Sequence, residues 1–210
     1  MKAAPARPDV VPFIAAWSDE QPHRRKVVYS GRGGIAFADE TPEDRDQFGV
    51  LWNGRAVARG AGRPEYGNVH PVRQRVAMEH RLCQVCGRSA DRDRRGVLWL
   101  IEDRRGDWKG WPNDLLTTHP PVCLPCAGKA VRMCPHLVGN SVAVRVRESD
   151  VCGVYGRVWS SSAFGHPVPT SVKDVVSYGT TAARWVLAGQ LVRALSGCTL
   201  VSLDELAAHP

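Results

Sequence analysis

The sequence lacks any apolar run long enough to cross a membrane. Its hydrophobic residues make up 43% of 210 positions but occur in short stretches, whereas a membrane-spanning helix needs about 20 consecutive apolar residues. The apolar stretch at residues 10–17 is short, is interrupted by Pro12 and is followed by two acidic residues. We therefore expect no signal peptide and no membrane partner. These absences predict a globular, cytoplasmic protein with one or two modest cores.

Lysine is scarce, and arginine supplies nearly all of the positive charge. The chain has 28 Lys and Arg against 21 Asp and Glu, giving a net charge of +7, and only five of the basic residues are lysines. An excess of cations favours an anionic partner such as DNA or RNA. Acids are interleaved with the arginines, so a solvated, salt-bridged surface is the alternative to a phosphate-binding one. The candidate phosphate contacts are Arg73, Arg75, Arg88, Arg94 and Arg95.

The sequence also lacks a complete catalytic or nucleotide-binding signature. The glycine cluster at 31–34 is too short and wrongly spaced for a phosphate-binding loop, so we interpret it as a turn between strands at 26–29 and 34–37. Weak candidates for acid–base or metal chemistry lie beside predicted turns and helix starts: Asp44, Asp46, His70 and His119. For each of them, a structural role in a turn, cap or loop is the alternative, and whether the protein is an enzyme stays open.

Two Cys-x-x-Cys pairs are the strongest chemical signal. Cys83 and Cys86 are followed by Gly87, which permits the positive φ of a zinc knuckle. Cys123 and Cys126 follow two prolines and begin a helix-forming stretch, where the helix dipole favours thiolates. Paired cysteines in a reducing compartment favour a metal over disulfides. The four cysteines predict one Zn²⁺ site, with an iron–sulfur cluster or separate buried or disulfide-bonded cysteines as alternatives.

The order of knuckle, hairpin strand at 96–101 and helix makes residues 82–137 resemble the treble-clef zinc fingers. The resemblance implies a small α+β unit organised around zinc. HNH nucleases are built on the same scaffold, with a histidine base on the hairpin, but the hairpin here offers no histidine. The nearby substitutes are His119 and Asn113 or Asp114, so the resemblance concerns the scaffold more than catalysis. The whole chain is also similar to proteins of high-GC bacteria, which implies no function.

A short pattern recurs along the chain. Residues 44–52 and 91–99 both read Asp-Arg-Asp, two variable residues, then Gly-Val-Leu-Trp, and a His-Pro pair and a predicted helix follow each. We hypothesise a duplicated treble-clef-like unit whose first copy is metal-free, and a coincidental turn and strand is the alternative. The predicted α+β organisation is an N-terminal arm at 1–27, a metal-free repeat at 28–81, a zinc unit at 82–137 and an α+β C-terminal region at 138–210.

The C-terminal region is predicted to combine strands with a helix. Period-two alternation and short apolar runs predict strands at 142–146, 154–159, 173–178 and 198–201. Apolar residues within 181–196 have helical spacing, with Gly197 as the terminator. Ser202 and Glu205 have the spacing of a capping box for a short last helix. The remaining cysteines, Cys134, Cys152 and Cys198, are expected to be core residues.

Three classes of function remain compatible with these observations. The first is a zinc protein that binds nucleic acid through its arginines without catalysis. The second is an enzyme, either a divergent HNH-like nuclease or one with a small-substrate cleft between the two repeats. The third is an interaction module whose zinc is purely structural. The sequence does not specify an oligomeric state.

Overall fold

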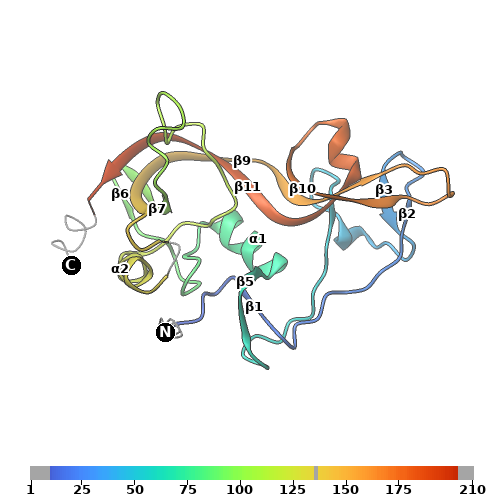
Figure 1. The fold of residues 1–210 in the computed structure, drawn as a ribbon, viewed down its shortest axis with the longest axis horizontal. Coiled ribbons are helices and arrows are strands. Elements are labelled where there is room, and N and C mark those ends of the chain that lie inside the picture. The colour runs from blue at the N-terminus through green and yellow to red at the C-terminus, as the bar shows by residue number, and fades with distance from the viewer. Residues whose placement is uncertain (1–9, 135–136, 203–210) are drawn as a thin grey trace, which may run out of the picture.

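The computed structural model describes residues 10–134 and 137–202. Two long antiparallel strands, β9 (Ser141–Ser160) and β11 (Val186–Val201), run the length of the molecule (Figure 1). Their pairing extends from Ala143 opposite Val201 to Val158 opposite Val186. Residues from this ribbon take part in each of the hydrophobic clusters of the described chain. The ribbon is therefore the common support of the fold.

The two ends of the ribbon carry different partners. At one end, β7 (Gly96–Glu102) pairs with the first part of β9, and β6 (Arg92–Asp93) pairs with β7. At the other end, β10 (Val168–Ser177) pairs with the last part of β9. Two short strands join β11, namely β4 (Leu51–Trp52) in parallel and β8 (Leu116–Thr117) in antiparallel orientation. All seven strands form one sheet, ordered β4-β11-β9-β7-β6 along its main path.

Two small two-stranded sheets lie outside this sheet. Strands β2 (Val27–Tyr29) and β3 (Ile35–Phe37) pair antiparallel, which confirms the predicted strands on either side of the glycine turn. In the N-terminal arm, β1 (Ala15–Trp17) pairs with β5 (Pro64–Val69). Two short 3₁₀ helices are also present, η1 (Pro42–Asp44) and η2 (Thr181–Trp185). Figure 1 shows β2, β3 and β10 together at the end of the molecule away from α2.

The described chain has two α-helices, α1 (Pro71–His80) and α2 (Leu124–Met133). Both begin where the sequence predicts, because a proline in the first turn suits a helix start. Helix α1 packs against β11, where the buried Gln74 side chain binds both backbone groups of Leu191. Neither helix is long and apolar enough to cross a membrane, and the described residues contain no other α-helix. Strands and helices together confirm the α+β class.

The predicted helix at 181–196 is wrong, because this segment forms η2 and most of β11. Its helix-forming residues are overruled by pairing with β9, which supplies backbone partners along the entire strand. Bulges at Ala188/Gln190 and Val192/Arg193 shift the alternation, so neighbouring Leu191 and Val192 are both buried. These shifts break the period of two and leave a spacing that imitates a helix.

The other predicted C-terminal strands are confirmed as parts of longer strands. Residues 142–146 and 154–159 belong to the single strand β9, 173–178 overlaps the end of β10, and 198–201 is the end of β11. The two copies of the recurring pattern occupy the same sheet: β4 pairs in parallel with β11, and β7 pairs antiparallel with β9. Cys152 and Cys198 are half-buried, as is Cys134 at the end of α2. The short helix predicted from Ser202 and Glu205 extends into residues outside the described chain.

Candidate metal centre

The first cysteine pair lies in a tight turn between α1 and β6. The backbone N–H of Gly87 donates to the carbonyl of Cys83 at 2.8 Å, and the N–H of Cys83 donates to the carbonyl of Arg88 at 2.6 Å. Gly87 has φ +74°, and a side chain there would meet the Phe13 ring at 2.8 Å. Two features therefore require glycine at this position: the positive φ of the backbone and the close approach of the Phe13 ring.

The second pair lies at the start of α2. Cys123 is the N-cap residue, and Cys126 lies within the first turn, with its N–H donating to the Cys123 carbonyl at 3.1 Å. The segment before α2 is tied to the first pair because Gln84 N–H donates to the Pro121 carbonyl at 3.0 Å. On its other side, Val122 N–H donates to the Leu98 carbonyl of β7 at 2.9 Å. Knuckle, hairpin and helix are therefore held in one unit.

These two elements bring the four cysteine sulfurs together. All four Sγ atoms lie within 4.8 Å of one another, and Cys86 Sγ is 3.7 Å from Cys123 Sγ. Four sulfurs around a tetrahedral ion with Zn–S bonds of about 2.3 Å are separated by about 3.8 Å, whereas a disulfide needs about 2.05 Å. All four cysteines are free thiols. The cluster can hold a metal ion in the tetrahedral geometry that thiolates favour.

The four thiols differ in burial and in pKa. Cys83 and Cys126 are buried, and Cys86 and Cys123 are half-buried. Burial raises the pKa of the Cys83 and Cys126 thiols, and the negative charge of the neighbouring sulfurs adds to the effect. Burial also acts to raise the pKa of Cys86, but hydrogen bonds from Arg88 N–H and from the other thiols outweigh it and lower this pKa to about 7. A cation within the cluster would offset the repulsion between neighbouring thiolates.

A hydrophobic cluster surrounds the four cysteines. The buried members around Cys83 and Cys126 are Leu98, Leu100, Val122, Ala127, Ala143 and Val201, drawn from β7, the segment before α2, α2 itself, β9 and β11. The N-terminal arm covers the knuckle, since Phe13 N–H donates to the Val85 carbonyl at 2.9 Å. This contact was not predicted, because nothing in the sequence relates an irregular arm to a turn 70 residues away.

The five candidate phosphate-binding arginines have different environments. Arg88, in the knuckle, and Arg94, in the β6–β7 turn, are exposed, and neither has an ion-pair partner among the described residues. Arg95 forms an ion pair with Asp93. Arg75 lies over the Trp52 ring and pairs with Glu79. Of these five candidates, Arg88 and Arg94 are therefore the ones that present an uncompensated charge in the unit that holds the cysteine cluster.

Arg73 is a correction to that set, because its guanidinium faces the interior. It is 7% exposed and pairs with the fully buried Glu20. Its remaining donors bind the backbone carbonyls of Phe13 at 2.7 Å and Ala15 at 2.6 Å. A phosphate could reach this side chain only if the N-terminal arm were displaced. Arg73 therefore fastens the arm to α1 and does not present its charge to a ligand.

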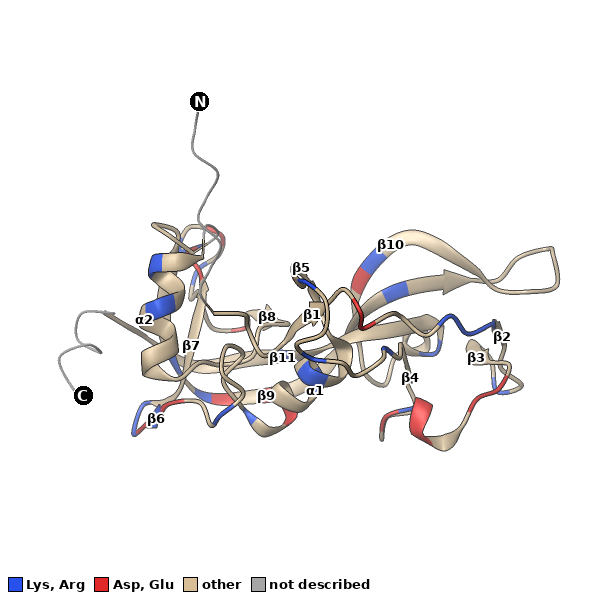
Figure 2. Ribbon diagram, turned by 90° about the horizontal axis from the view of Figure 1, so that it is seen from below, with Lys and Arg blue, Asp and Glu red and all other residues tan. Residues whose placement is uncertain are grey.

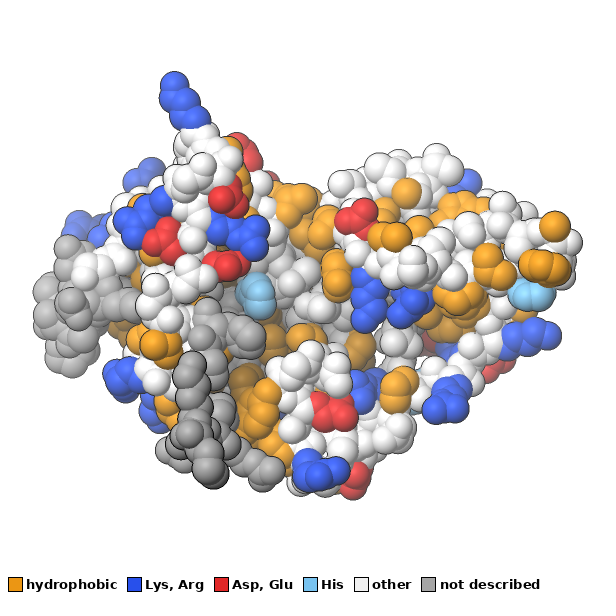
Figure 3. Space-filling view, in the orientation of Figure 1, with side chains coloured by type: hydrophobic (Ala, Val, Ile, Leu, Met, Phe, Trp, Pro, Cys, Tyr) orange, Lys and Arg blue, Asp and Glu red, His pale blue; other side chains and the backbone are white. Residues whose placement is uncertain are grey.

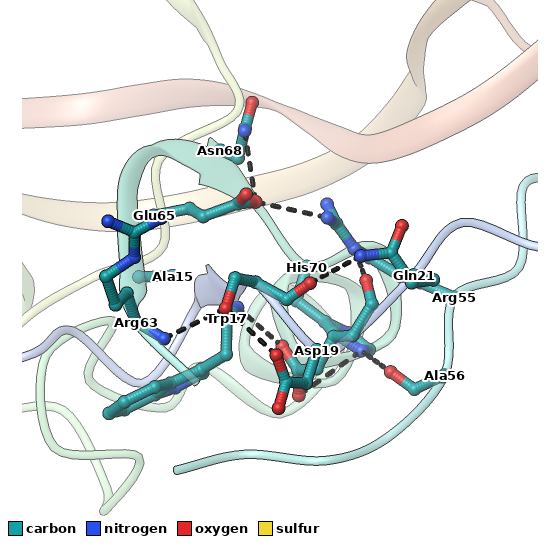
Figure 4. Close-up of polar contacts among 12 residues, drawn as sticks. Ala15, Trp17, Asp19, Gln21, Arg55, Ala56, Arg63, Glu65, Asn68 and His70 are labelled. Carbon is teal, nitrogen blue, oxygen red and sulfur yellow. Dashed lines mark hydrogen bonds and ion pairs between the residues drawn. The ribbon is translucent and has the colours of Figure 1, made fainter. Parts of the chain in front are cut away.

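The catalytic candidate His70 is the buried N-cap residue of α1. Its Nδ1 accepts from Arg73 N–H at 3.4 Å, and its Nε2 lies 3.1 Å from the Ala56 carbonyl (Figure 4). Burial and the positive charge of Arg73 lower the pKa of His70, although the bond to Ala56 acts to raise it. With one nitrogen accepting and the other donating, the ring is a neutral structural group. The neighbouring Arg55–Glu65 ion pair of 3.1 Å lies beside it (Figure 4).

The other catalytic candidates belong to separate local networks. Asp44 closes the capping box of η1 with Thr41 and forms an ion pair with Arg25. Asp46 accepts four hydrogen bonds. The donors are the backbone N–H groups of Phe48 and Val50, the Trp52 indole and the Tyr178 hydroxyl. His119 is exposed, and its backbone carbonyl binds the Trp99 indole at 2.9 Å. Within the described residues, the hydrogen bonds and ion pairs of these side chains do not join them in one site.

The cluster of four cysteines, which could hold a metal ion, is thus the candidate site that the described residues build. Comparisons of the chain with protein-family models, with curated proteins and with solved structures find no match.

Proposed function

We propose that the protein is a zinc-binding, non-catalytic nucleic-acid-binding protein. The observation that carries the zinc assignment is the convergence of four cysteine sulfurs within 4.8 Å. Four thiolates without water or carboxylate ligands are typical of a closed, structural zinc site, which leaves no open position for catalysis. Cys83, Cys86, Cys123 and Cys126 would hold the ion. The order of knuckle turn, β6–β7 hairpin and α2 supports a treble-clef unit at residues 82–137.

The proposed partner is DNA or RNA because exposed cations surround this unit. Ion pairs neutralise three of its arginines, through Asp93–Arg95, Glu102–Arg104 and Asp103–Arg105. The exposed cations without an ion pair among the described residues are Arg88, Arg92, Arg94, Lys109, Lys129 and Arg132. Helix α2 and the β6–β7 turn lie at the same end of the molecule (Figure 2), so their charges can act on one polyanion.

Binding should be measured by fluorescence anisotropy of the zinc-loaded protein with labelled duplex DNA, single-stranded DNA and RNA over a series of salt concentrations. Each phosphate contact contributes about 0.9 to the salt slope on duplex DNA and about 0.7 on a single strand. The double variant Arg88→Gln/Arg94→Gln should weaken binding and lower the slope. Arg104→Gln/Arg105→Gln is the matched control, since these charges are already compensated. Equal effects of both double variants, or no salt-dependent binding, would contradict the proposal.

The duplication stays a prediction. It proposes that residues 28–81 descend from the same unit as 82–137, with the metal ligands absent from the first copy. Superposing residues 36–81 on 83–133 tests it, and an unrelated order of turn, strand and helix would refute it.

A further inference from the structure

The turn between β9 and β10, residues 161–167, lies at the end of the molecule opposite the cysteine cluster (Figures 1 and 2). Phe164 in this turn is 79% exposed, the largest fraction among the exposed large hydrophobic side chains of the described chain. A single exposed apolar side chain is ordinary on a protein surface. Its significance therefore depends on how the turn is held and on what surrounds it.

Hydrogen bonds hold the turn in a defined shape. Ser162 Oγ donates to the His166 carbonyl at 2.6 Å and accepts from Phe164 N–H at 3.2 Å. Tyr29 anchors the turn from β2, since its hydroxyl accepts from Ser162 N–H at 2.9 Å and donates to the Ser162 carbonyl at 3.2 Å. The Tyr29 ring in turn packs edge-on against Trp185, with ring centroids 6.3 Å apart. These contacts fix the conformation of the turn that carries the exposed Phe164 ring.

Uncompensated cations lie behind the turn. Arg157 of β9 and Lys173 of β10 are directly opposite each other, and both are exposed. Like charges at such cross-strand positions are destabilising unless an anion lies between them. At the neighbouring β2–β3 turn, Arg184 donates to the Arg32 carbonyl at 3.3 Å, which brings two more exposed cations together. Within the described residues, none of these four has an ion-pair partner.

Three carboxylates of this end are engaged in ion pairs elsewhere, whereas Asp174, next to Lys173, and Glu43 are exposed and have no ion-pair partner among the described residues. Asp39 and Asp44 both bind Arg25, and Glu40 binds Arg45. Figure 3 shows hydrophobic, histidine and basic side chains side by side on the surface of this end. The surface therefore combines an exposed aromatic ring with an excess of positive charge.

We propose that this surface, formed by Phe164, Arg157, Lys173, Arg32 and Arg184, binds single-stranded nucleic acid, with one base stacked on the Phe164 ring. The inference rests on the proposed function and adds a second nucleic-acid-binding surface, at the opposite end of the molecule from the exposed cations near the cysteine cluster, with single strands as its ligand class. Aromatic rings beside backbone-tracking cations are the combination that binds single strands without sequence preference. A duplex keeps its bases stacked on one another, so it cannot offer a base face to a ring at a turn. Arg157 lies three residues, about 10 Å, before the end of β9, and Phe164 lies beyond that end in the turn. A strand that contacts both Arg157 and Phe164 must therefore be several nucleotides long.

The test is fluorescence anisotropy of the full-length, zinc-loaded protein with a labelled 12-nucleotide oligothymidine. Phe164→Ala should weaken binding about 5- to 150-fold, the range for loss of one base–aromatic stack. Phe164→Tyr should retain affinity, and Val172→Ala is the matched control, since Val172 is an exposed β10 side chain (51%) without a ring. Thermal unfolding should be unchanged in all three, because these side chains bury little surface.

Two further readouts separate stacking from charge. On an abasic strand of the same length, wild type and Phe164→Ala should bind equally. Arg157→Gln and Lys173→Gln should each lower the salt slope by about 0.7, whereas Phe164→Ala should leave the slope unchanged. Equal affinity of wild type and Phe164→Ala for oligothymidine, or an equal loss of affinity by Phe164→Ala on duplex DNA, would overturn the inference. If Arg88→Gln/Arg94→Gln still weakened binding, the proposed function would survive, whereas absence of salt-dependent binding by the wild type would end both.

Discussion

Arg73 and Glu20 form a buried, two-point ion pair. The two terminal nitrogens of Arg73 donate to the two carboxylate oxygens of Glu20 at 2.5 and 2.7 Å. Glu20 is fully buried, and backbone N–H groups of Trp17 and Ala58 donate to it at 2.9 and 3.2 Å. The pair joins the N-terminal arm to α1. Removing either partner would leave a buried charge without compensation.

The first prediction is that Arg73→Met destabilises the protein by about 3–5 kcal/mol, the cost of breaking a buried pair by removing one partner. Arg75→Met is the matched control on the same helix, because the ion pair of Arg75 with Glu79 is partly exposed and should contribute about 1 kcal/mol or less. Urea unfolding at neutral pH measures both changes. An equal loss of unfolding free energy in the two variants would mean that the buried pair stabilises the protein no more than the partly exposed one.

The same pair predicts a dependence of stability on pH. Burial acts to raise the pKa of Glu20, but hydrogen bonds from Arg73, Trp17 and Ala58 and the charge of Arg73 lower it from 4.5 to about 2. The unfolded chain therefore binds more protons than the folded one between these values. The resulting stabilisation, about 3 kcal/mol, is complete above pH 4.5 and is lost as the pH falls toward 2.

Glu20→Gln should remove this dependence, so its stability should change less than that of the wild type as the pH falls below 4.5. Both proteins keep the cysteine cluster, and any acid-induced loss of metal therefore cancels in the comparison. Glu43→Gln, at an exposed position, is the control. Parallel pH profiles for wild type and Glu20→Gln would show that the carboxylate has an ordinary pKa.

Loss of one cysteine ligand should unfold the zinc unit. Structural zinc sites have apparent binding free energies of about 10–16 kcal/mol, which exceeds the stability of many domains. Cys83→Ser and Cys126→Ser should therefore give insoluble or partly unfolded protein with less bound zinc. Cys152→Ser is the control, since this half-buried thiol lies outside the cluster and its bond to the Val192 carbonyl suits a hydroxyl. Unchanged folding of the wild type after treatment with a strong chelator would contradict a structural role for the metal.

Gly87→Ala should weaken the knuckle. The left-handed conformation costs about 1–2 kcal/mol for a residue with a side chain, and the added methyl group would displace the Phe13 ring. Gly67→Ala is the matched control, because no atom lies within 4 Å of the added methyl group and no left-handed backbone is required. The expected result is a lower melting temperature and faster zinc loss for Gly87→Ala alone, measured by calorimetry and a chromogenic chelator. Equal behaviour of both variants would refute it.

Asp46→Ala should cost about 2–3 kcal/mol, since hydrogen bonds to charged acceptors are among the stronger ones. Asp46 accepts from the Trp52 indole at 2.9 Å and the Tyr178 hydroxyl at 2.8 Å. Asp39→Ala, which removes a 71% exposed side chain, should cost about 1 kcal/mol or less.

Burial and the Asp46 carboxylate raise the pKa of Tyr178, so in Asp46→Asn the phenol should titrate at lower pH than in the wild type. An ultraviolet pH titration without such a shift would contradict this contact.

Chemistry confined to short segments was predictable from the sequence. Each Cys-x-x-Cys pair places two sulfurs on one turn of backbone, so only the meeting of the two turns depends on the fold. The starts of α1 and α2 follow from local signals too, because a helix begins where its first N–H groups and a proline can be accommodated. The glycine turn between β2 and β3 is of the same kind.

What the residues around these segments do was decided by contacts far apart in the chain. Residues 181–196 have helical spacing but form η2 and most of β11, because β9 supplies backbone partners for the strand and bulges shift its side-chain alternation. Arg73 has the composition of a phosphate contact, yet a glutamate 53 positions earlier holds it in the interior. The local sequence determined each sulfur pair, Cys83 with Cys86 and Cys123 with Cys126, and the tertiary structure decided that the two pairs meet. The tertiary structure also decided the orientation of Arg73, His70 and Asp46, because a polar side chain binds whichever buried partner the fold brings within hydrogen-bond distance.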